Sequence, residues 1–155
     1  MKRLLFISNL LLILTQFTSA QDTPPPFSVS DLEGNSYSLD ALQGQVVVLN
    51  FWFIQCKPCV QEMPELNELV KKYEDKVVFL AFATNEAPAL KAFLKKRDFD
   101  YHIIPESQAV AEAYGVEGYP THVVIDPKGK VTYRTMGLSP FTIQELESSI
   151  KQSLP

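Results

Sequence analysis

The stretch that decides the fold is an apolar run ending in two cysteines, VVVLNFWFIQCKPC at residues 46–59. Residues 46–53 are mostly β-branched or aromatic, which is typical of a strand buried on both faces of a parallel sheet. Apolar residues at spacings of three and four then continue to Tyr73 and predict an amphipathic helix, kinked at Pro64. Cys56 and Cys59 therefore lie where a buried strand passes into a helix.

Strands and helices alternate through the rest of the chain. Further strands are expected at residues 77–83, 101–104, 121–125 and 131–135. Helices are expected at residues 87–97, 108–114 and 142–154. Apolar residues at 27–29 and 37–39 flank a turn-forming segment and predict a small hairpin. The sequence thus predicts one α/β domain with a central mixed sheet, helices on both faces and an N-terminal β-hairpin extension.

Residues 1–20 differ in composition from the rest. A positive start at Lys2 and Arg3 precedes an apolar run and the small residues Thr18-Ser19-Ala20, which together describe a secretory signal peptide. The run is shorter than the roughly 20 residues that span a bilayer, so we expect cleavage rather than an uncleaved anchor. Residues 21–26 read as a proline-rich lead-in and residues 27–155 as the domain. We expect a periplasmic or otherwise extracytoplasmic protein.

The charge balance argues against two classes of partner. The 155-residue chain carries 14 basic and 18 acidic residues, a formal net charge of −4, and loss of Lys2 and Arg3 makes it more negative. Such a surface repels nucleic acids and anionic lipids. We expect a monomer with no nucleic-acid partner.

The spacing of the two cysteines favours chemistry over structural stapling. A bridge across two intervening residues constrains the unfolded chain very little. The N-terminus of a helix stabilises a thiolate, and Lys57 adds a positive charge beside it. Cys56, at the exposed edge, is expected to attack, and Cys59, one turn deeper, to resolve the mixed disulfide. Pro58 sets the first helical turn.

A proline at the start of a strand supports the same site. Pro120, in the segment Gly118-Tyr119-Pro120-Thr121, removes a donor from the ladder of the strand that it begins. A cis Tyr119–Pro120 bond explains its presence there. Such a turn would leave the Tyr119 backbone free to pair with an extended substrate.

Together these motifs resemble the thioredoxin superfamily and, more narrowly, its exported branch of ResA- and TlpA-type reductases, which are related to AhpC/TSA proteins. The pattern C-x-P-C followed by x-x-E-x-P at residues 56–64 carries the resemblance, together with the segment around Pro120 and the strand end at residues 123–126. Residues 27–44 resemble the extension that this branch shares with peroxiredoxin-like proteins. The resemblance covers roughly residues 26–154 and implies a thioredoxin fold.

What the resemblance implies is a thiol–disulfide oxidoreductase with no cofactor and no metal. Relatives of this kind receive electrons from a membrane electron-donor protein and reduce disulfides in exported proteins, including apocytochromes c. The direction of electron flow in this chain stays open, because reductants and oxidants share the same chemistry.

The resemblance also suggests further site residues. Glu86 falls where such reductases place an acidic residue near the cysteines; if buried, it could accept a proton from Cys59, and otherwise it is a solvated carboxylate before a helix. Glu62 is the glutamate of the family pattern, although on its own it would be an exposed helix charge.

Four residues that border the dithiol are expected to contact the substrate: Trp52, Lys57, Pro58 and Tyr119. Gln55 and Tyr119 depart from the family, which usually has a tryptophan and a smaller residue at these positions. Both departures leave the substrate and the reduction potential open.

Three other functions remain as alternatives. A Cu(I)-binding metallochaperone of the same fold would use soft thiolates with an imidazole, and His102 and His122 lack a matching spacing. A peroxiredoxin-like peroxidase would need a threonine where Phe53 stands. An inactive interaction module would hold an inert disulfide.

Overall fold

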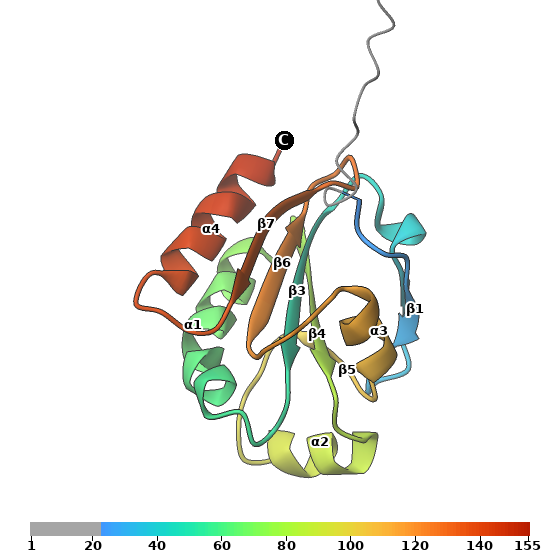
Figure 1. Cartoon of the computed structure of the whole chain (residues 1–155), viewed down its shortest axis with the longest axis vertical. Coiled ribbons are helices and arrows are strands. Elements are labelled where there is room, and N and C mark those ends of the chain that lie inside the picture. The colour runs from blue at the N-terminus through green and yellow to red at the C-terminus, as the bar shows by residue number, and fades with distance from the viewer. Residues whose placement is uncertain (1–22) are drawn as a thin grey trace, which may run out of the picture.

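The computed structural model describes residues 23–155 (Figure 1). The predicted signal peptide and the first residues of the lead-in lie outside the described residues. Within residues 23–155, no helix has both the length and the apolar character needed to cross a membrane.

A five-stranded mixed sheet forms the centre of the domain, in the order β5-β4-β3-β6-β7. Its strands are β3 (Val46–Trp52), β4 (Val77–Ala83), β5 (His102–Ile104), β6 (Thr121–Ile125) and β7 (Val131–Met136). β3, β4 and β5 run parallel, whereas β6 and β7 pair antiparallel with their neighbours. β3 is therefore the middle strand, and its carboxyl end leads directly to the cysteines.

Other elements cover both faces of this sheet (Figure 1). α1 (Lys57–Tyr73) and α4 (Thr142–Ser153) lie on one face, and α2 (Ala87–Leu94) lies at the lower end of the molecule in this view. The other face is covered by α3 (Gln108–Ala113) and by the hairpin of β1 (Ser28–Ser30) and β2 (Ser36–Ser38). A short 3-10 turn, η1 (Asp40–Leu42), follows the hairpin. The predicted fold class, with its N-terminal hairpin, is confirmed.

Alternation along β3 divides the core into two clusters. Val48 and Trp52 pack with α1 and α4, whereas Leu49 and Phe51 pack on the α3 side. Every residue of β3 is buried, as its composition predicts for a central strand. Asn50 shares this burial despite its polar side chain, so it must find hydrogen-bond partners inside the core.

α1 includes Pro64 within its span and ends at Tyr73, as the apolar spacing predicts. The end of α2 differs from the sequence expectation. α2 ends at Leu94, three residues before the expected end, because the Lys96 N–H bonds to the Phe93 carbonyl and closes a tighter turn there.

Candidate active site

The two cysteines form a disulfide at the start of α1. Their sulfurs are 1.97 Å apart and their Cα atoms 5.3 Å apart. Cys56 is the N-cap residue of α1, and its Sγ accepts a hydrogen bond of 3.3 Å from the Cys59 N–H. This donor is one of the unpaired amides of a helix start, which also stabilise a Cys56 thiolate after reduction. Cys56 is 5% exposed and Cys59 only 1%, consistent with an attacking and a resolving thiol.

The loop before the cysteines is held from two sides. Its Ile54 N–H donates to the Asn85 Oδ1 at 2.8 Å, which ties it to the loop after β4. The Cys56 N–H donates to the Phe53 carbonyl at 3.1 Å. These bonds fix the position of Cys56 relative to the carboxyl ends of β3 and β4.

The proline segment lies against this loop. The Tyr119–Pro120 bond is cis, as predicted. The Tyr119 ring packs edge-on against the Phe53 ring, with centroids 5.2 Å apart, and the Pro120 carbonyl accepts from the Gly137 N–H at 2.7 Å. Within residues 23–155, the Tyr119 main chain makes no hydrogen bond, which leaves it available to an incoming strand.

A hydrogen-bonded polar group lies inside the core, with one of its residues a helical turn after Cys59. We call its residues, Asn50, Glu62 and His122, the buried trio. Asn50 Nδ2 lies 3.2 Å from Glu62 Oε1 and 3.2 Å from His122 Nδ1. His122 Nε2 lies 3.1 Å from the Glu62 carboxylate oxygens. All three residues are at most 1% exposed. They come from β3, α1 and β6, so the trio links three elements.

Glu62 is therefore not the exposed helix charge that the sequence alone suggests. It follows Cys59 by three residues and so lies one turn further along the same face of α1. That face is the one packed on the sheet. The missed signals were a polar residue in each of two apolar strands, Asn50 and His122, since a buried polar group needs a partner.

Glu86 is not buried, which was the condition for it to accept a proton from Cys59. It is exposed at the N-cap of α2 and its side chain makes no capping bond. The neighbouring Asn85, which sequence reasoning passed over, makes the contact to the cysteine loop instead.

One of the expected substrate contacts is wrong. Trp52 is completely buried, with its ring against Phe93 and Phe99, so it supports the site from within the core. Lys57 is exposed and Pro58 half-buried beside the disulfide, so both remain accessible.

The two histidines lie in separate environments. His122 belongs to the buried trio, whereas His102 is half-exposed beside Asp31, with Nδ1 3.5 Å from Oδ2. Across the part of the chain that the structure describes, no cluster of three or more His, Cys, Asp or Glu side chains is arranged to hold a metal ion.

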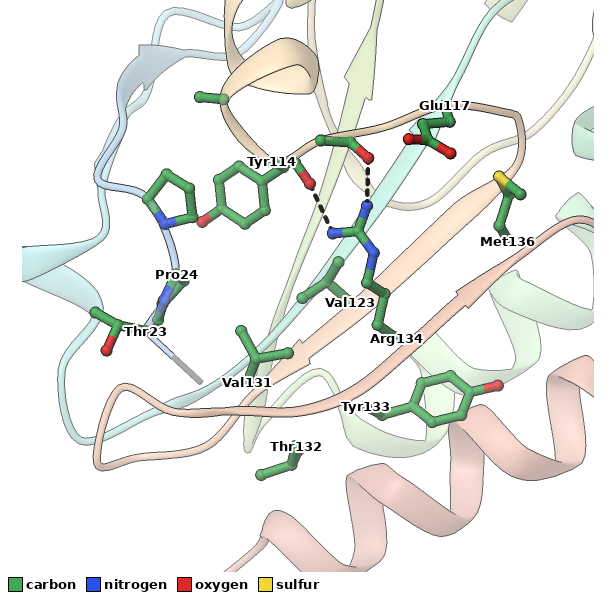
Figure 2. Close-up of a pocket in the computed structure, with 13 residues that line it drawn as sticks. Thr23, Pro24, Tyr114, Glu117, Val123, Val131, Thr132, Tyr133, Arg134 and Met136 are labelled. Atoms are coloured by element: carbon green, nitrogen blue, oxygen red, sulfur yellow. Dashed lines mark hydrogen bonds between the residues drawn. The ribbon is translucent and has the colours of Figure 1, made fainter. Parts of the chain in front are cut away.

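A large groove lies elsewhere, between α3 and β7 (Figure 2). It has a volume of about 730 Å³ and is bordered by Pro24 and Pro25 of the lead-in. On its wall, Arg134 donates to the carbonyls of Tyr114 and Gly115 at 2.7 and 2.8 Å, which satisfies the end of α3 (Figure 2). Neither cysteine lines this groove.

Comparison with known proteins agrees with this geometry. A model of the AhpC/TSA family matches residues 20–134. The thiol-disulfide oxidoreductase ResA of Bacillus thuringiensis (strain Al Hakam) is 39% identical over 134 residues, which cover 84% of this chain and 76% of the relative. The thioredoxin-like protein YneN of Bacillus subtilis is 33% identical over 130 residues, 81% of this chain and 75% of the relative.

A solved structure extends the likeness to the fold. The putative thiol:disulfide interchange protein DsbE from Chlorobium tepidum superposes with a TM-score of 0.79 at 28% identity, covering 86% of this chain and 96% of that one. Fold, disulfide and relatives agree. The chain belongs to the AhpC/TSA family and is a thiol–disulfide oxidoreductase of the ResA- and TlpA-like branch of the thioredoxin superfamily.

Proposed function

We propose that this oxidoreductase works outside the cytoplasm as a reductant of disulfides in exported proteins, apocytochromes c among them. Its electrons come from a membrane electron-donor protein. The observation that carries the proposal is the placement of an acidic side chain, Glu62, inside the core one turn from Cys59.

The burial of Glu62 near Cys59 bears on the direction of electron flow. A dithiol becomes strongly oxidising when its reduced form is stabilised, as when a thiolate is strongly favoured. A buried carboxylate nearby acts the other way, because like charges disfavour a second anion. The helix N-terminus and the exposed Lys57 still favour the Cys56 thiolate. Together these opposing effects give Cys56 enough thiolate to attack. They do not stabilise the reduced form as strongly as in an oxidant.

Substrate access supports a protein partner. Lys57, next to Cys56 in the chain, is exposed, and the main chain of Tyr119 makes no hydrogen bond within the described residues. An extended segment carrying a disulfide can pair with that backbone while its sulfur meets Cys56. Export itself is supported by the pattern of residues 1–20.

Trapping tests the exchange and its partners. In the Cys59→Ser variant, Cys56 attacks but nothing resolves the product, so mixed disulfides with substrates should accumulate in the native compartment. Cys56→Ser should abolish exchange and trap nothing, and the double serine variant is the control. Full insulin-reducing activity in either single variant would overturn the assigned roles.

A redox titration tests direction. Equilibration with glutathione should place the Cys56–Cys59 couple well below the strongly oxidising potential of about −120 mV. An oxidised C-x-x-C-H peptide, the haem-attachment motif of c-type cytochromes, should be reduced faster than a peptide with widely spaced cysteines. Equal rates would argue against apocytochromes as preferred substrates.

Mass spectrometry tests export. The mature chain should begin at Gln21 and be recovered outside the cytoplasm. A chain that keeps Met1 and stays in the cytoplasm would remove the extracytoplasmic role and leave the exchange chemistry intact.

A further inference from the structure

The hydrogen bonds of the buried trio define where its protons lie. An amide nitrogen carries two hydrogens, and Asn50 Nδ2 lies within bonding distance of two acceptors, Glu62 Oε1 and His122 Nδ1. If Asn50 donates to both, His122 Nδ1 is an acceptor and the ring proton is on Nε2. That Nε2–H then donates to the Glu62 carboxylate. The geometry points to a neutral imidazole and an ionised carboxylate, with every donor used.

The opposite amide orientation demands a different proton count. Turning the Asn50 oxygen toward its neighbours would require a proton on Glu62 Oε1 and another on His122 Nδ1, since two acceptors cannot face each other. The charge of the trio is thus tied to one side-chain orientation. The observed donors favour the anion, although burial without such donors would favour the protonated acid.

We propose that His122 is a positioning residue for disulfide exchange: its hydrogen bond holds Glu62 ionised beneath the dithiol, ready to take the proton of Cys59. This inference rests on the proposed exchange reaction and deepens it. Glu62 and Cys59 lie one turn apart on the buried face of α1. Cys59 must lose a proton when its sulfur attacks, and a carboxylate one turn away on the same face of the helix can accept it.

In the resolving step, Cys59 attacks the mixed disulfide between Cys56 and the substrate. The Cys59 thiol passes its proton to the Glu62 carboxylate and its sulfur attacks Cys56 Sγ in the mixed disulfide. The Cys56–Cys59 bond forms, the bond from Cys56 to the substrate sulfur breaks, and the substrate cysteine leaves as a thiolate. The protein pair is oxidised by two electrons and the substrate disulfide is reduced. Glu62 then returns its proton to the departing thiolate or to solvent.

Two strands supply the hydrogen-bond partners of Glu62. β3 contributes Asn50 and β6 contributes His122, and Cys59 precedes Glu62 by one turn on α1. Tyr101, just before β5, is the further ionisable neighbour, and its hydroxyl is buried without a hydrogen-bond partner in the described part of the chain. Burial raises the pKa of Tyr101 well above its usual value, and the charge of Glu62 adds to the shift. Tyr101 therefore stays neutral over the pH range of the test.

The experiment separates the two thiol steps. Reduced protein mixed with the aromatic disulfide dithionitrobenzoate forms a Cys56 mixed disulfide, and Cys59 then resolves it. Each step releases one coloured thiolate, so both rates are read in one trace. The second rate, followed against pH, reports the proton transfer from Cys59.

Three variants give distinct expectations. Glu62→Gln removes the acceptor and should slow the second step by about 100-fold, the lower end of general-base contributions. His122→Leu removes the donor and should slow it by about tenfold at neutral pH, the effect of one lost hydrogen bond to a charged group. His122→Gln keeps a donor for Glu62 and an acceptor for Asn50, and should restore the second rate. The first step, the attack of Cys56, should not change in His122→Gln, which leaves the charge of Glu62 as it is.

His102→Gln is the matched control, because it removes the exposed histidine and should leave both steps unaltered. Asn50→Asp covers the case in which His122→Leu does not fold. It keeps the shape but places a second carboxyl group against Glu62, so the second step should move to higher pH by about one unit or more.

An unchanged second step in His122→Leu, a slow second step in His122→Gln, or an unshifted profile in Asn50→Asp would each overturn the proposal. Failure of Cys59→Ser to trap substrates would instead defeat the proposed function, since the two readouts are independent.

Discussion

Asp31 shows how a single buried carboxylate organises the turn between β1 and β2. Its Oδ1 accepts from the backbone N–H groups of Glu33 and Asn35 at 2.9 and 2.8 Å, and Oδ2 accepts from Asn35 Nδ2 at 2.9 Å. Burial alone would raise the pKa of Asp31, but the hydrogen bonds from Asn35 and Glu33 outweigh it and lower the pKa from 3.8. The stabilisation is therefore present above pH 3.8 and is lost as the pH falls below it.

Asp31→Asn should lower the free energy of unfolding by about 1–2 kcal/mol at neutral pH, because charge-assisted hydrogen bonds are replaced by weaker ones. The difference from the parent should shrink as the pH falls below 3.8. Urea denaturation at a series of pH values measures both. His102→Gln removes only a half-exposed neighbour and should change stability little. A difference that does not vary with pH would contradict the electrostatic explanation.

At the scale of single residues, the sequence predicted which residues react better than it predicted which side chains are buried. Cys56, Cys59 and the cis bond before Pro120 could be predicted, because a short spacing and an awkward proline are local signals. Trp52 and Glu62 could not be placed, since burial of a side chain depends on what another element lays over it. Trp52 is covered by Phe93 and Phe99, which are more than forty residues away in sequence.

Glu147 joins two helices at the element scale. Its carboxylate on α4 accepts hydrogen bonds from Lys72 and Tyr73 of α1 and from Lys151 of α4. The bonds from Lys72, Lys151 and Tyr73 together hold the pKa of Glu147 at about 2 instead of 4.5. Because this pKa is lowered on folding, the interactions of Glu147 stabilise the folded protein above pH 4.5. Their contribution is lost as the pH falls toward 2.

Glu147→Gln should cost about 1 kcal/mol of unfolding free energy at neutral pH, the upper range for a partly exposed ion pair. Raising the salt concentration should reduce that cost. The control is Glu68→Gln, which breaks an exposed pair within α1 and should have a smaller effect. Thermal melts of the two variants at low and high salt make the comparison; equal losses would show that the α1–α4 contact adds nothing.

Element positions follow the periodic pattern closely, but element ends do not. The β-rich runs at 77–83 and 121–125 coincide with β4 and β6, because buried strands are rich in apolar and β-branched residues. The end of α2 depends on the bond from Lys96 to Phe93, which no pattern of side chains specifies. Sheet order likewise needs long-range pairing.

At the scale of the whole molecule, the disulfide and the large groove lie apart. The groove of about 730 Å³ lies on the α3 side, whereas the disulfide lies at the carboxyl end of β3. A bridge across two residues adds little entropy-based stability. Oxidised and reduced forms should therefore share one fold and differ in stability mainly through the chemistry at the site.

The sign of the stability difference between the oxidised and reduced forms tells whether the protein is a reductant or an oxidant. Folding, reduction of the folded protein and reduction of the unfolded chain form a closed thermodynamic cycle. If the folded protein is a reductant, it favours the disulfide more than its unfolded chain does, so reduction must lower the free energy of unfolding. An oxidant shows the reverse order, because its reduced form is the stabilised one. Each 30 mV of potential between folded and unfolded couples corresponds to about 1.4 kcal/mol.

We expect the oxidised form to be the more stable by about 1–3 kcal/mol, a difference corresponding to about 20–65 mV. Urea denaturation of both forms, with the reduced sample kept under excess dithiol, measures it directly. Glu62→Gln should narrow the gap, because removing the buried carboxylate relieves the repulsion that disfavours thiolates in the reduced site. A reduced form more stable than the oxidised one would assign the protein to the oxidants while leaving Cys56 as the attacking thiol.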